Sequence, residues 1–145
     1  MSKAPELSLR LIVLEPPSGV RFAVQRGKNE LLRPTSEGPT SLQFDIVLRL
    51  GRRPDGAPNF LGPYAQGPAA ARFVYVNSGT RAGQTESSWR RRAKVPLTGI
   101  RWAQIEALHT RPGAVLEVRV AGRSKDGGPV CGSVRLGTDA WRVVS

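Results

Sequence analysis

The sequence predicts a mainly β protein, an antiparallel β-sandwich of about seven to eight strands with one short helix; a small β-barrel is the alternative. Short stretches in which apolar and polar residues alternate recur along the chain, and clusters of glycine and proline separate them. Helix and strand patterns do not alternate, so a doubly wound α/β fold is not expected. The 145 residues fit a single domain, residues 1–145.

The first part of the chain carries three predicted strands. Apolar residues occupy every second position over residues 6–14, 20–25 and 42–50. The first two strands are joined by the short EPPSG segment, which predicts that they are antiparallel partners. Residues 26–41 are polar and contain glycine and proline, so we expect a loop there.

The middle of the chain holds its densest clusters of glycine and proline. Two Gly-Pro pairs bracket Tyr64 and Gln66, which predicts a stiff and closely packed loop. The centre of residues 72–77 (RFVYVN) is continuously apolar, as in a strand that is covered on both faces. After a polar loop, residues 89–97 (WRRRAKVPL) alternate basic with apolar side chains. This pattern predicts a basic strand at the edge of a sheet.

The last third predicts the one helix and three further strands. Thr98 is the expected helix cap. The segment GRSKDGGP contains Asp126-Gly127, a strong signal for a turn between two strands. We expect the helix over residues 98–109 and the strands over residues 115–120, 130–136 and 141–144.

The chain is strongly basic, with 22 Lys and Arg against 11 Asp and Glu and a net charge of +11. Such a charge favours binding to polyanions, including nucleic acid. The composition offers a second explanation, because arginine, alanine, glycine and proline are all abundant. A GC-rich genome produces this composition, and arginine then accumulates on any solvated surface.

Cysteine, histidine and the N-terminal residues exclude several classes of site. The single cysteine, Cys131, cannot form an intrachain disulfide, and with the single histidine, His109, it cannot build a Cys/His zinc site. We expect Cys131 to be a buried, inert thiol and His109 to end the helix. The first apolar run is short and contains Arg10, so we expect no signal peptide or membrane span, and a cytoplasmic location. No metal or cofactor is predicted.

Five stretches of the chain resemble a known family. They are LRLIVLEPPSGVRFAVQRG (9–27), FLGPYAQGP (60–68), RFVYVNSGTRAGQ (72–84), WRRRAKVPLTGIRW (89–102) and KDGGPVC (125–131). With them the chain resembles the bacterial family catalogued as domain of unknown function 5990, over nearly its whole length. The resemblance implies a single-domain bacterial protein and brings with it no activity, substrate or cofactor.

The leading functional hypothesis is a non-catalytic binding or interaction module, for a small anionic ligand or a protein partner. The loops at residues 62–68 and 79–88 would meet at one end of the sandwich, where polar and arginine side chains would line a pocket with aromatic walls. The alternative explanation is tight loop packing with Trp89 in the core. The candidate ligand-binding residues are Tyr64, Gln66, Arg72, Thr80, Arg81, Gln84, Trp89 and Arg91.

The second hypothesis is binding of nucleic acid through the outer face of the basic strand. Its candidate residues are Arg90, Arg92, Lys94 and Arg101, which would contact phosphates. Against it stand the small number of aromatic residues for stacking and the ordinary role of charge in protecting a sheet edge. An enzyme is the third hypothesis. The sequence contains no phosphate-binding glycine loop and no nucleophile elbow, so no catalytic residue is predicted.

Overall fold

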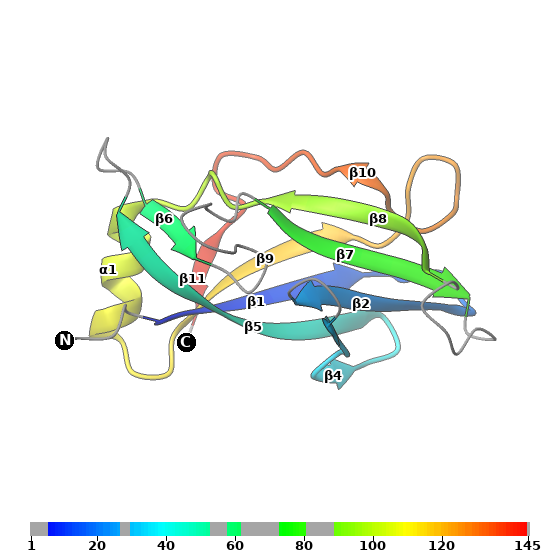
Figure 1. Cartoon of the computed structure of the whole chain (residues 1–145). Coiled ribbons are helices and arrows are strands. Elements are labelled where there is room, and N and C mark those ends of the chain that lie inside the picture. The colour runs from blue at the N-terminus through cyan, green and yellow to red at the C-terminus, as the bar shows by residue number, and fades with distance from the viewer. Residues whose placement is uncertain (1–5, 27–29, 53–57, 62–72, 81–88, 145) are drawn as a thin grey trace.

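The computed structural model describes residues 6–26, 30–52, 58–61, 73–80 and 89–144. Over these ranges the chain forms two β-sheets that pack together, with one helix at an end of the sandwich (Figure 1). The predicted mainly β fold with one short helix is confirmed, and the described strands do not close into a barrel. Each sheet contains one parallel pairing, so the sheets are mixed rather than purely antiparallel.

The first sheet has six strands in the order β11-β9-β1-β5-β4, with β6 also paired to β5. Strand β1 lies at its centre, antiparallel to β5 and parallel to β9. A parallel pair needs a long crossover, and the chain between β1 and β9 passes through the second sheet and the helix. The bounds are β1 Glu6–Leu14, β4 Ser36–Glu37, β5 Ser41–Arg52, β6 Pro58–Leu61, β9 Val115–Ala121 and β11 Arg142–Val144.

The second sheet has five strands in the order β10-β8-β7-β2-β3. Its central strand, β7, is antiparallel to both β2 and β8, and β8 is parallel to β10. The bounds are β2 Val20–Arg26, β3 Glu30–Leu32, β7 Phe73–Thr80, β8 Trp89–Pro96 and β10 Gly132–Ser133.

Three sequence predictions about pairing need correction. The first two strands are not partners, because β5 and β9 occupy both edges of β1 and the chain crosses to the other sheet through a turn at Gly19, whose φ is 75°. The expected loop at 26–41 contains β3 and β4, which pair with exposed edges of β2 and β5. The expected strand at 130–136 is reduced to the two residues of β10, the first of which, Gly132, has φ 76°.

The core lies between the two sheets and follows the predicted alternation. The four alternating apolar residues of β1 are at most 1% exposed: Leu7, Leu9, Leu11 and Val13. From the opposite sheet, Ala93 and Val95 of β8 are fully buried. Trp141 closes one edge of the core, where its indole Nε1 donates to the carbonyl oxygen of Pro96 at 3.1 Å.

Helix α1, Trp102–Thr110, begins later than predicted. Thr98 lies in the preceding turn, and Arg101 is the N-cap residue; its backbone N–H donates to Oε1 of Gln104 at 3.0 Å. Ile105 is buried, and the helix contacts β9 and β11 at the end of the six-stranded sheet. Within the described ranges, no helix is long and apolar enough to span a membrane.

Candidate functional site

Most of the predicted pocket lies outside the described residues. This applies to Tyr64, Gln66, Arg72, Arg81 and Gln84. For the pocket residues Thr80 and Trp89, at adjoining ends of β7 and β8, only the backbone is described. The pocket therefore stays a prediction, and Arg91 is the one member of the set whose side chain is described.

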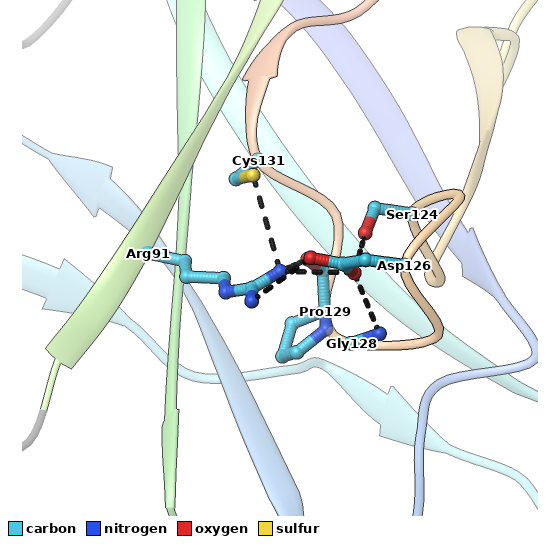
Figure 2. A network of polar contacts seen from close by, with 6 residues as sticks. All are labelled: Arg91, Ser124, Asp126, Gly128, Pro129 and Cys131. Atoms are coloured by element: carbon cyan, nitrogen blue, oxygen red, sulfur yellow. Dashed lines mark hydrogen bonds and ion pairs between the residues drawn. The ribbon is translucent and has the colours of Figure 1, made fainter.

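Arg91 extends from β8 to the turn between β9 and β10, where it meets Asp126 (Figure 2). The two terminal nitrogens face the two carboxylate oxygens, with Nη2 3.1 Å from Oδ2 and Nη1 3.3 Å from Oδ1. Nη1 also donates to the carbonyl oxygen of Pro129 at 3.0 Å. This forked, charge-assisted contact ties the turn to β8.

Asp126 is held by its own turn as well as by Arg91. Its Oδ1 accepts hydrogen bonds from the Ser124 hydroxyl and from the Gly128 backbone N–H, the second at 2.8 Å. The Ser124 hydroxyl, the Arg91 guanidinium and the Gly128 N–H together hold the pKa of Asp126 well below its ordinary value, and Asp126 in return raises the pKa of Arg91. At neutral pH the two groups are an ion pair, so the chain itself supplies the anion beside Arg91.

Cys131 is exposed, so the prediction of a buried thiol is wrong. Its Sγ lies 4.0 Å from Nη1 of Arg91, on the segment that leaves the turn (Figure 2). The prediction failed because it assumed a strand through residues 130–136, whereas the strand here covers only Gly132–Ser133.

A second group of side chains lies on the outer face of the five-stranded sheet. Ala93 and Val95 point into the core, so the alternation of β8 places Arg92 and Lys94 on the opposite face, where both are exposed. This confirms the expected two faces of the strand. Arg90, the third predicted basic residue, belongs to β8, but its side chain is not among those described.

Strand β7 adds two aromatic rings to this outer face. Phe73 and Tyr75 alternate with buried valines and are half-buried. Lys94 is directly opposite Tyr75 in the sheet. The Arg92 Cζ lies 5.1 Å from the ring centroid of Tyr75, and the Lys94 Nζ lies 5.8 Å from that of Phe73. Both distances are typical of cation–π contacts.

Asn77 completes the row and fixes the direction of Arg92. It is directly opposite Arg92 in the sheet and is only 6% exposed. Its Oδ1 accepts from Arg92 Nε at 3.1 Å, and its Nδ2 donates to Oε1 of Gln25 at 3.5 Å. We refer to Phe73, Tyr75, Asn77, Arg92 and Lys94 as the outer-face cluster.

The aromatic part of this cluster was missed in the sequence. The apolar run in residues 72–77 predicts a strand covered on both faces, but Phe73 and Tyr75 are covered in part by the cations of the neighbouring strand. The available signal was the spacing of the two rings, two residues apart and therefore on one face. Arg101 is not on these strands: it caps α1, with its Nη2 3.8 Å from Asp139 Oδ1.

Carboxylates pair with part of the basic charge on the six-stranded sheet but not with the cations of the outer-face cluster. On the six-stranded sheet, Arg10 lies between Asp45 and Glu117, at 3.6 and 3.8 Å. In the part of the chain that is described, Arg92 and Lys94 have no carboxylate partner. The described residues also contain no group of three His, Cys, Asp or Glu side chains that could hold a metal ion.

Fold and surface together define a class: a small two-sheet β protein with a basic and aromatic outer sheet face. The chain belongs to the family of unknown function DUF5990, whose model matches residues 7–144. This match confirms the resemblance that the sequence motifs indicated. No curated protein and no solved structure matches the chain.

Proposed function

We propose that this protein is a non-catalytic binding module that binds nucleic acid through the outer-face cluster. The observation that carries the proposal is the pair Arg92 and Lys94. Both side chains are exposed, lie beside aromatic rings, and have no carboxylate partner among the described residues. Two cations without a protein counter-charge are an electrostatic match for the phosphates of a nucleic acid.

The aromatic rings support this choice of surface. On the six-stranded sheet Arg10 and Arg119 are paired with carboxylates, Arg119 at 3.2 Å from Glu117. Arg49 and Arg142 of the same sheet are exposed without an ion pair among the described residues. Unpaired cations therefore occur on both sheets, and the outer-face cluster differs in holding its two cations beside aromatic rings. The net charge of +11 adds long-range attraction for any polyanion. A cytoplasmic location, as the sequence predicts, is part of the proposal.

The ionic strength at which binding is lost tests the proposal. Phosphate contacts release counter-ions, so the logarithm of the binding constant falls linearly with the logarithm of salt, by about 0.7 to 0.9 per contact. We expect binding of labelled oligonucleotides at about 50 mM salt, and a slope reduced by roughly 1.4 to 1.8 in the double variant Arg92→Ala/Lys94→Ala.

The matched control is the double variant Arg119→Ala/Arg142→Ala, which removes the same charge from exposed residues of the six-stranded sheet. It should bind with nearly the wild-type slope. Absence of binding by the wild type at low salt would refute nucleic-acid binding. Equal losses in the two double variants would show that overall charge, rather than the outer-face cluster, is responsible.

The pocket hypothesis stays a separate prediction. Five of its eight residues lie outside the described part of the chain, and a further two are described only in their backbone. The remaining one, Arg91, is paired with Asp126. For this reason the outer-face cluster, rather than the loop pocket, carries the proposed function.

A further inference from the structure

We infer that the outer-face cluster is selective for single-stranded nucleic acid, with successive bases stacked at Phe73 and Tyr75; this inference rests on the proposed function. The two residues are two positions apart on β7, so their rings share one face of the sheet. The ring centroids are 6.4 Å apart. Each ring is therefore a separate place for a base on an extended strand.

The width of the sheet argues against a duplex. At the level of Tyr75 all five strands lie side by side, because Tyr75 is opposite Lys94, Lys94 is opposite Ser133, and the next residue of β7 connects through β2 to β3. Five strands about 4.8 Å apart span roughly 19 Å, whereas the major groove of B-DNA is about 12 Å wide. A ring on the central strand of such a sheet cannot reach base edges in a groove.

A single strand does not meet this obstacle. Its bases are free to turn outward and lie on the sheet, where stacking on an aromatic ring is tolerant of sequence because every base has a π-face. In a duplex the same faces are already covered by neighbouring base pairs. Phe73 and Tyr75 can therefore distinguish the two forms, whereas Arg92 and Lys94 would bind the phosphates of either.

The two cations have different roles in this arrangement. Arg92 is anchored through Nε to the buried Asn77, and its guanidinium lies over Tyr75. Bases also stack on guanidinium groups, so a base can stack on the Arg92 guanidinium above Tyr75, and the Nη groups of Arg92 can donate to a phosphate. Among the described residues, the ammonium group of Lys94 contacts only the Phe73 ring. Its flexible stem allows it to leave that ring to a base and turn to a phosphate.

The test compares three ligands: a mixed-sequence single-stranded oligonucleotide, a duplex of half its length so that both hold the same number of phosphates, and heparin, a polyanion without bases. Wild-type protein should bind the single strand more tightly than the duplex. Tyr75→Leu should weaken single-strand binding by roughly 5- to 150-fold, the range expected for one stacked base. It should leave heparin binding unchanged, and Tyr75→Phe, which keeps the ring, should retain single-strand binding.

Phe73→Leu provides an independent variant in case Tyr75→Leu does not fold, which circular dichroism and thermal unfolding would show. A 2-aminopurine base in the oligonucleotide reports stacking directly, as a loss of fluorescence on binding to wild type. Equal affinity for single strand and duplex, unaffected by either leucine variant, would overturn the inference and leave nucleic-acid binding intact. Failure of the wild type to bind either nucleic acid would overturn both.

Discussion

Replacement of Gly122 by alanine tests how tightly the C-terminal ends of the parallel strands β1 and β9 pack against each other. A Cβ at this position would lie 2.7 Å from the carbonyl oxygen of Leu14 and 3.0 Å from Cα of Pro16. Both atoms are backbone, so neither can rotate away. The backbone N–H of Gly122 also donates to that same Leu14 oxygen at 2.7 Å, so any shift that relieves the clash lengthens a hydrogen bond.

The expected loss follows from these contacts. Forcing an extra carbon into a packed site costs about 1–3 kcal/mol, and each kcal/mol lowers the melting temperature of a domain of this size by about 3–4 °C. Gly122→Ala should therefore melt roughly 3–12 °C below the wild type in differential scanning calorimetry.

Gly137→Ala is the matched control for Gly122→Ala. It adds the same methyl group where nothing lies within 4 Å, and Gly137 does not have a positive φ. It should melt within about 2 °C of the wild type. If the two alanine variants melt together, the backbone of β1 and β9 is not in contact at Gly122 and the packing described for this end of the sheet is wrong.

Two further substitutions test the ion pair of Asp126 and the hydrogen bond of Trp141. The ordinary pKa of Asp126 is 3.8 and its native pKa is lowered, so the ionised carboxylate stabilises the fold above about pH 4, and this contribution is lost as the pH falls toward the native pKa. Asp126→Asn should be less stable than the wild type at pH 7 and should lose less stability on acidification. Urea titrations at pH 7 and below about pH 4 measure both effects. Parallel pH profiles of the two proteins would contradict the ion pair with Arg91. Trp141→Phe removes the donor to the Pro96 carbonyl and should lower the free energy of unfolding by about 1–3 kcal/mol. An unchanged free energy of unfolding in Trp141→Phe would show that this hydrogen bond contributes nothing.

Local patterns in the sequence were sufficient to predict which face of an individual strand is buried. The alternation in β1 predicts the burial of Leu7 through Val13, and the alternation in β8 separates buried Val95 from exposed Lys94. The period of two depends only on the pleat of an extended chain, so it is visible before any partner strand is known. The same reasoning distinguished a mainly β protein from an α/β fold.

The partners of each strand were decided only in the tertiary structure. Several segments have equally good alternation, and any of them satisfies the hydrogen bonds of β1, so the sequence favoured the nearest one and was wrong. The meeting of Tyr75 with Arg92, and of Arg91 with Asp126, depends in the same way on which segments lie side by side. Hydrophobic alternation is a property of neighbouring residues in the chain, whereas a site assembled across strands depends on pairing between distant segments. The composition and alternation therefore determined the class of fold and the basic face of one strand, and the pairing of β7 with β8 decided that this face also carries aromatic rings.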